Sequence, residues 1–180
     1  MPHMKIRLGV RPAKPGENTM AAEAHLNVTH LQWGVKQSFR GYVEGAGGTI
    51  TIAGGTERTP DGSFTFPVDE AVLSLNAEGQ LEGRATFKGE VSFKAHGGML
   101  NVFLAEPILE ITAGEAKLTV ADTLSRKYRT EVARLDLVGM SQDEAGNLTL
   151  STALSMDGIQ WLGDHYPLRA PLDQATLLVG

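Results

Sequence analysis

The sequence predicts a mainly β fold, either an antiparallel β-sandwich or a flattened barrel, with one short helix near residues 35–45. Three observations predict this fold class. Most of the chain alternates apolar and polar residues as strands do, turn sequences such as TPDGS and DEAGN separate these runs, and a single segment has the period of a helix. Many short strands at this spacing are typical of sandwiches and barrels.

The first expected elements are a strand and the helix. HLNVTHLQW, residues 25–33, alternates apolar and polar side chains and predicts a strand that ends at Gly34. The helix is predicted over VKQSFRGYVEG, residues 35–45, because four apolar side chains fall at i, i+4, i+7 and i+8 on one face: Val35, Phe39, Tyr42 and Val43. A glycine-rich stretch then ends the helix.

The rest of the chain is expected to form strands and turns. β-branched or alternating runs predict strands at TITIAGG, SFTFPV, AVLSLN, LEGRATFKGEVSFKA, MLNVFLAEP, ILEIT, AKLTVAD, EVARLDLVG, NLTLSTALS and ATLLV. Within EVSFKAH, alternation places His96 on the side away from the main apolar row. Gly97 and Gly98 follow and remove side chains where the chain turns or where a large group comes close.

Length and composition indicate one folded domain. A chain of 180 residues, with 42% hydrophobic and 21% charged residues, has room for a single core and the composition of an ordinary globular protein. We expect an N-terminal arm over residues 1–24, which is rich in Pro, Gly, Ala and charge, and a single domain over 25–180.

Charge and cysteine content exclude several classes of function. A net charge of −5 argues against a nucleic-acid partner, and the absence of cysteine excludes disulfides, thiolate nucleophiles and Cys-based metal sites. No run approaches the roughly 20 apolar residues of a membrane-spanning helix. The N-terminal residues also lack the apolar segment of a signal peptide, which predicts a cytoplasmic protein or one whose leader was removed.

The motifs of common enzymes are missing from the sequence. The five histidines form no HxH or HxxxH pair, and there is no GxSxG elbow, no P-loop and no GxGxxG that opens a helix. Neighbouring carboxylates, as at Asp69 and Glu70, fall in predicted turns, where solvated charge is the usual state. We therefore expect no enzymatic activity.

Two longer motifs resemble a known family. The first is WGVK with SFR and YV, residues 33–43, and the second is FxGxVxFxxHxGxLxVxLxxP, which runs from Phe87 to Pro107. In this order they resemble the HtaA domain, the haem-transport-associated domain of actinobacterial haem-uptake proteins. The resemblance extends from about Leu26 to Leu177, and WLGDHYPLRAPLD is similar to the family's closing aromatic–Gly–Tyr segment.

The resemblance implies a ferric haem b cofactor held by one tyrosine. It makes Tyr42 the axial ligand of the iron and His96 a hydrogen-bond partner of that tyrosine, beside glycines that let a flat macrocycle approach. A hydrogen bond from His96 to the phenolate oxygen would stabilise the anionic form of the ligand. A hard, anionic phenolate suits Fe(III) better than Fe(II), so such a site would loosen on reduction.

The remaining candidate residues surround this pair. Ser38, one turn before Tyr42, and the backbone N–H groups of residues 35–37 are expected to donate to a haem propionate. Lys36 and Arg40 are further propionate candidates, with solvated surface charge as the alternative.

Four apolar or aromatic side chains are expected to form a wall against the porphyrin, with an ordinary core position as the alternative: Met99, Phe103, Trp161 and Tyr166. His165 has no counterpart in the family pattern and becomes the next candidate ligand if Tyr42 is not one.

Competing interpretations stay open at this point. Without the resemblance, Tyr42 is a core aromatic with its hydroxyl at the rim. One alternative function is a β-sandwich module that binds a protein or glycan without haem. Another is a haem peroxidase, although the sequence offers no distal His–Arg arrangement. The haem interpretation implies haem-donor or haem-acceptor proteins as partners and a cell-surface or secreted location, and it leaves the oligomeric state undetermined.

Overall fold

The computed structural model describes residues 24–180, so the predicted N-terminal arm lies outside the described residues except for Ala24. The elements in chain order are β1 (Ala24–His25), β2 (Val28–Trp33), α1 (Gln37–Gly45), β3 (Thr49–Ala53), β4 (Glu57–Arg58), β5 (Phe64–Leu75), β6 (Leu81–Phe87), β7 (Glu90–Ala95), the 3-10 helix η1 (His96–Gly98), β8 (Leu100–Thr112), β9 (Glu115–Ala121), β10 (Arg129–Leu135), β11 (Ser141–Gln142), β12 (Leu148–Leu150), β13 (Thr152–Leu154), α2 (Met156–Trp161) and β14 (Ala175–Val179).

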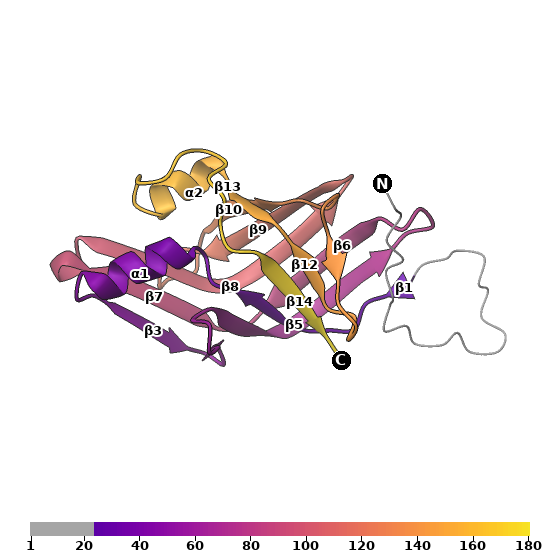
Figure 1. Ribbon diagram of the computed structural model, residues 1–180, viewed down its shortest axis with the longest axis horizontal. Helices are drawn as coiled ribbons and strands as arrows, with labels where there is room; N and C mark the ends of the chain where they lie inside the picture. Colours follow the sequence, from indigo (N-terminus) through magenta and orange to yellow (C-terminus); the bar gives the residue numbers. More distant parts are fainter. Residues whose placement is uncertain (1–23) are drawn as a thin grey trace.

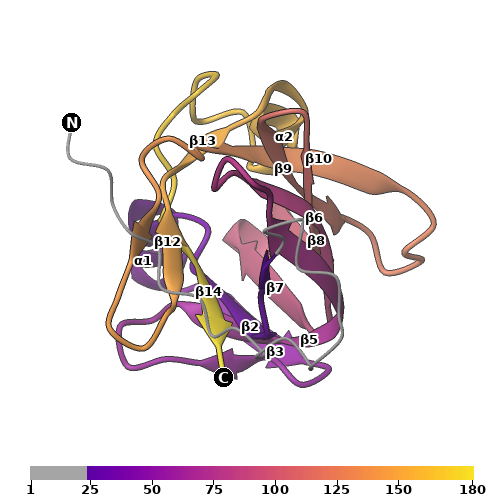
Figure 2. The same cartoon turned by 90° about the vertical axis from the view of Figure 1, so that its right-hand side faces the viewer.

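Within residues 24–180, fourteen strands form one curled antiparallel sheet. Its main path runs β11-β12-β14-β2-β5-β6-β8-β9-β10-β13. β12 lies near one end of this path and β13 at the other, yet a single residue, Ser151, separates them in the chain. The two ends of the sheet therefore lie close together, and Figure 2 shows the sheet curling round on itself. The predicted fold class is confirmed.

Two predicted breaks between strands are bulges inside longer strands. SFTFPV and AVLSLN form one strand, β5, whose pairing with β6 shifts register between Val68 and Glu70. MLNVFLAEP and ILEIT likewise form β8, with a register shift between Ala105 and Ile108. A bulge inserts an extra residue and interrupts the alternation of faces. The sequence pattern therefore predicted the end of a strand at positions where the strand continues through a bulge.

The long strand β8 positions the site because its two halves have different neighbours. β7 and then β6 run along one edge of β8, whereas β9 pairs with the other edge only from Ala105 onward. Before that point the second edge meets α2, where the indole N–H of Trp161 donates to the carbonyl oxygen of Phe103 at 2.9 Å. β3, β7 and the start of β8 thus extend beyond the rest of the sheet, beside α1 (Figure 1).

The predicted helix is confirmed and a second one is added. α1 begins at Gln37, two residues later than expected, because Lys36 is extended and Val35 has a φ of 67°, outside the helical region. α2 was not expected from the sequence, since six residues are too few to establish a helical period.

Candidate functional site

Tyr42 and His96 meet at the end of the molecule that carries α1. The phenol oxygen of Tyr42 lies 2.6 Å from Nε2 of His96, across 54 residues of sequence, and the two ring centroids are 5.7 Å apart. Either group serves as the donor, depending on the tautomer of the imidazole. The pair that the sequence predicted is therefore brought together.

An aromatic contact in the core holds α1 and β7 at the distance that brings Tyr42 and His96 together. Phe39 of α1 packs on Phe93 of β7 with ring centroids 5.2 Å apart, and Phe93 in turn meets Phe64 edge-on at 5.9 Å. Tyr42 follows Phe39 by three residues, and His96 follows Phe93 by three. The buried phenylalanine pair thus fixes the distance between α1 and β7, and the functional pair lies one step further along both elements.

Tyr42 is more exposed than the sequence predicted. Its side chain is 48% exposed, and the buried residues of α1 are Phe39, Val43 and, unexpectedly, Arg40. At 100° per residue, Tyr42 lies at the border of the apolar face rather than at its centre. The phenol therefore faces outward beside His96, together with exposed Ser38 one turn earlier.

The backbone at His96 turns the imidazole away from the core. Its φ is 53°, and Gly97 and Gly98 continue at 65° and 94°, so three residues in succession are left-handed. Glycine adopts this region without strain, whereas histidine does so at a cost. A Cβ at Gly97 or Gly98 would meet nothing within 4 Å. The expected open space beside His96 is present.

A loop after α2 lies across from this pair. A Cβ at Gly163 would lie 3.4 Å from Cδ2 of His165 and 3.5 Å from Cδ1 of Leu100, which places His165 beside the start of β8. The next residue, Tyr166, has its ring 5.4 Å from Nζ of Lys36. The loop therefore approaches both the β8 side and the α1 side of the site.

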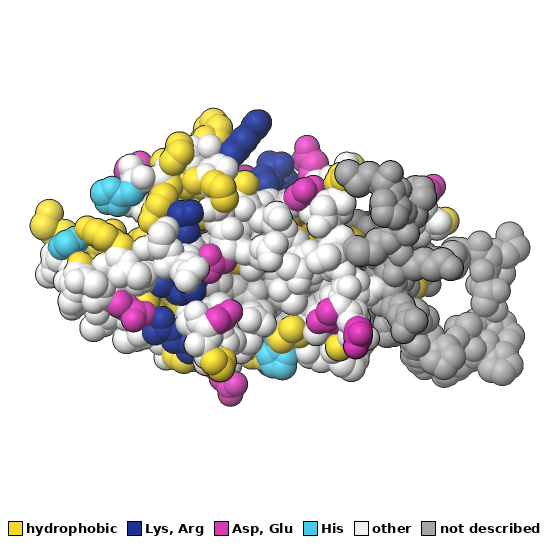
Figure 3. Space-filling model, viewed as in Figure 1, with side chains coloured by type: hydrophobic (Ala, Val, Ile, Leu, Met, Phe, Trp, Pro, Cys, Tyr) yellow, Lys and Arg dark blue, Asp and Glu magenta, His cyan; other side chains and the backbone are white. Residues whose placement is uncertain are grey.

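Exposed apolar side chains gather at this end of the molecule. Met99 is 92% exposed and Leu168 46% exposed, a state that is unusual for large hydrophobic groups. Figure 3 shows hydrophobic side chains, with histidine side chains among them, over the end that carries α1 and α2. Such a surface can contact an apolar, planar ligand.

Phe103 and Trp161, two of the expected wall residues, both lie along β8, and Trp161 also packs against the main core. Val102 and Leu104 of β8 belong to the main core, whereas Phe103 packs separately with Ala105 and Ala121. Because successive side chains point to opposite faces of a sheet, Phe103 lies on the face away from α1. The indole N–H of Trp161 is bonded to the Phe103 carbonyl at the β8 edge. Phe103 is therefore directed away from the helix that carries Tyr42.

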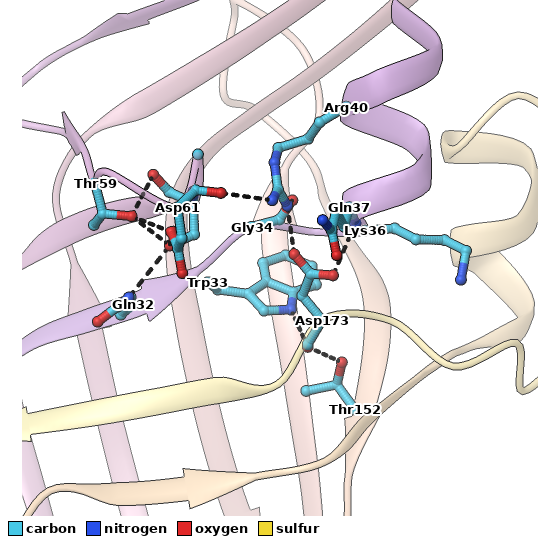
Figure 4. A network of polar contacts seen from close by, with 12 residues as sticks. Gln32, Trp33, Gly34, Lys36, Gln37, Arg40, Thr59, Asp61, Thr152 and Asp173 are labelled. Carbon is cyan, nitrogen blue, oxygen red and sulfur yellow. Dashed lines mark hydrogen bonds and ion pairs between the residues drawn. The ribbon is translucent and has the colours of Figure 1, made fainter.

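Three of the expected propionate donors at the start of α1, namely Arg40, Lys36 and the backbone N–H of Gln37, are already bonded within the protein. Arg40 is only 6% exposed and forms an ion pair with Asp173, while Nζ of Lys36 donates to the carbonyl of Pro171 at 2.5 Å. The backbone N–H of Gln37 donates to Oδ1 of Asp173 at 2.8 Å. Figure 4 shows the contacts of Gln37 and Arg40 meeting at the Asp173 carboxylate. The sequence missed Asp173, because nothing in its local pattern indicates a partner 133 residues away.

Asp61 belongs to the polar network drawn in Figure 4, and the pKa of its carboxyl is low. Hydrogen bonds from Ser63 and Thr59 lower this pKa from 3.8 to about 2. Its carbonyl oxygen lies 3.5 Å from a guanidinium nitrogen of Arg40. This cluster contacts α1 through Arg40 and does not include Tyr42.

The described residues contain neither a site for a bare metal ion nor a membrane-spanning helix. Among residues 24–180, no group of three or more His, Cys, Asp or Glu side chains could hold a bare metal ion. Iron inside a macrocycle needs only an axial protein ligand, which an exposed tyrosine can supply. No helix in the described part of the chain is long and apolar enough to cross a membrane.

Fold and site together define a curled β-sheet protein that presents a tyrosine–histidine pair from a short helix and a hairpin tip. The HtaA family model matches residues 28–178, and the chain belongs to the HtaA family. The resemblance noted in the sequence is thereby confirmed. In the search of curated proteins, nothing matched the chain.

Solved structures with the same fold come from Corynebacterium glutamicum. The C-terminal domain of HtaA aligns with a TM-score of 0.67 at 24% identity, over 84% of this chain and 95% of that one. The N-terminal domain of HtaA gives 0.63 at 22% identity, over 86% and 98%. The heme-binding protein HtaB gives 0.61 at 19% identity, over 88% and 95%. At these identities the likeness establishes the fold.

Proposed function

We propose that this protein binds ferric haem b and captures or relays it, with Tyr42 as the axial ligand and His96 as the hydrogen-bond partner of that ligand. The observation that carries the proposal is the 2.6 Å contact between the Tyr42 phenol oxygen and Nε2 of His96. Membership of the HtaA family and the structural likeness to HtaB, a heme-binding protein, support it.

The ligand chemistry follows from the exposed phenol. When bound, ferric haem would supply a Lewis-acidic iron, and Tyr42 would hold it as a phenolate after giving its proton to solvent. His96, with its proton on Nε2, then donates to the phenolate oxygen and stabilises the negative charge. A phenolate favours Fe(III) over the softer Fe(II), so reduction is expected to weaken binding.

The residues around Tyr42 and His96 are proposed to contact the propionates and the porphyrin ring of the haem. Ser38 is exposed on the same helical face as Tyr42 and is proposed as a propionate donor, because Arg40 and Lys36 are engaged by the 171–173 segment. Met99, Tyr166 and Trp161 are proposed to contact the porphyrin faces, whereas Phe103 packs separately with Ala105 and Ala121. A site with one strong ligand and an open approach suits transfer of haem between proteins rather than turnover.

A hemin titration with absorption spectroscopy tests the proposal. The expected result is a Soret band that saturates at one haem per chain, a high-spin ferric tyrosinate spectrum, and release of haem when dithionite is added. No saturable Soret band would favour the interaction module that binds no haem. A ferrous complex that persists with a bis-histidine spectrum would reject Tyr42 and direct attention to His165. Peroxide turnover by the haem complex would instead favour an enzyme.

A further inference from the structure

The helix that carries Tyr42 has no N-terminal cap from its own sequence. Its N-cap residue is Lys36, which makes no side-chain cap hydrogen bond, and its first turn contains no acidic residue. The first N–H groups of a helix need acceptors from outside the helix. Asp173 supplies one of them, because its Oδ1 accepts the backbone N–H of Gln37 at 2.8 Å.

The second oxygen of the same carboxylate holds the next turn of the helix. Oδ2 of Asp173 is paired with Nη1 of Arg40, which also donates to the carbonyl of Gly34 at 2.8 Å. The Arg40 side chain is 7% exposed and that of Asp173 24%. A charge that is buried to this degree needs its partner, so loss of either one leaves the other uncompensated.

The backbone of Asp173 is fixed as firmly as its side chain. Its N–H donates to the carbonyl of Val35 at 2.8 Å, and its carbonyl accepts from the indole of Trp33 at 2.9 Å and from the hydroxyl of Thr152 at 2.7 Å. Figure 4 shows Asp173 between the strand before α1 and the helix itself. The carboxylate therefore acts from a rigid position.

Val35 adds an independent observation at the same place. It is a buried, β-branched residue with a φ of 67°, a conformation that such residues rarely adopt. Strained residues of this kind persist only where the surroundings fix them. The bond from the Asp173 N–H to the Val35 carbonyl is one such restraint, two residues before α1 begins.

We propose that Asp173, acting with Arg40, is a positioning residue for the haem ligand. It fixes the direction in which α1 leaves β2, and thereby sets the phenol of Tyr42 against His96 and the iron. Asp173 itself does not touch haem in this arrangement. The inference rests on the proposed function for its haem readout, while its effect on α1 is measurable without haem.

The test compares two variants that each remove a carboxylate from an ion pair made by α1. Asp173→Asn keeps the size of the side chain and removes its charge, whereas Glu44→Gln breaks the exposed pair between Glu44 and Arg58, whose atoms are 2.5 Å apart. Release of haem to apomyoglobin should be roughly tenfold faster for Asp173→Asn, as for other residues that orient a metal ligand, with an altered tyrosinate charge-transfer band. Glu44→Gln should stay within about twofold, since exposed pairs contribute little.

Amide hydrogen exchange of the haem-free protein separates this inference from the proposed function. Exchange of residues 38–43 should quicken in Asp173→Asn and stay unchanged in Glu44→Gln. If the wild-type protein binds no haem, the proposed function fails while the exchange result still decides the role of Asp173.

Unchanged exchange and unchanged haem release in a folded Asp173→Asn protein would overturn the inference, as would a uniform loss of protection over the whole sheet. If Asp173→Asn does not fold, Arg40→Lys provides the second variant, because lysine keeps the charge and loses the fork that spans two acceptors. It should show the same quickened exchange of α1, and an unchanged α1 would equally count against the inference.

Discussion

The ring of Tyr42 packs on the fold, whereas its hydroxyl oxygen is the proposed ligand of the haem iron. Tyr42→Phe removes that oxygen, so haem binding should be lost, while the free energy of unfolding should hardly change because the side chain is 48% exposed. Hemin titration and urea unfolding check both parts. Tyr128→Phe is the matched control, because Tyr128 is also exposed, at 69%, and should keep the wild-type spectrum. A Tyr42→Phe protein with an unchanged spectrum would refute the ligand assignment.

His96 combines a hydrogen bond with an unusual backbone. His96→Ala should weaken haem binding about 10–100-fold without abolishing it, as is typical when a group behind a metal ligand is lost. Alanine also bears the cost of the left-handed φ of 53°, whereas asparagine tolerates that region better. His96→Asn should therefore unfold at a higher urea concentration than His96→Ala. If haem is lost in His96→Ala but retained in Tyr42→Phe, the two roles are reversed.

Asp61 predicts how the 59–63 turn responds to acid. The pKa of its carboxyl is lowered to about 2 by hydrogen bonds from Ser63 and Thr59, so the folded state binds its proton more weakly than the unfolded chain does. The stabilisation is present above the ordinary value of 3.8 and is lost as pH falls through about 2. Urea unfolding of the wild type and of Asp61→Asn should therefore differ at pH 5 and converge toward pH 2. A constant difference over this range would contradict the assignment.

At the scale of elements, α2 covers an edge of the sheet that no strand covers. Trp161→Phe keeps most of the packing and removes the donor to the Phe103 carbonyl, so unfolding should cost about 0.5–1.5 kcal/mol less. Gln160→Ala, at an exposed position of the same helix, should have a smaller effect. Urea unfolding of both variants measures the difference, and equal values would show that the Phe103 carbonyl gains nothing from the indole.

The sequence predicts elements better than it predicts their partners. The position of α1 and the meeting of Tyr42 with His96 were predictable, the first from the helical period and the second from the family motifs. The burial of Arg40 was not predictable from the sequence. Periodicity identifies the buried face of a helix, but it does not identify the distant carboxylate that allows a charged side chain to be buried there. The face of the sheet on which Phe103 lies was not predictable either, because its neighbours Val102 and Leu104 are apolar too and the sequence does not alternate there.

At the scale of the whole molecule, haem should stabilise the fold by mass action. At a free haem concentration a thousandfold above the dissociation constant, the gain is about 4 kcal/mol. For a domain of this size the melting temperature should rise by roughly 8–16 °C. A thermal melt with and without hemin measures the shift, with Tyr42→Phe as the control that should show none. A wild-type melting temperature that hemin leaves unchanged would count against specific binding.

The contact between Arg40 and Asp173 also has a consequence for biosynthesis. The two residues are 133 positions apart, so at ~5–20 residues per second Asp173 follows Arg40 from the ribosome by roughly 7–27 s. The pairing of β2 with β14 is delayed in the same way, because β14 lies near the C-terminal end of the chain. A nascent chain that has already exposed Tyr42 and His96 therefore lacks the carboxylate that sets the helix. Loading with haem is expected to follow translation of this segment rather than accompany it.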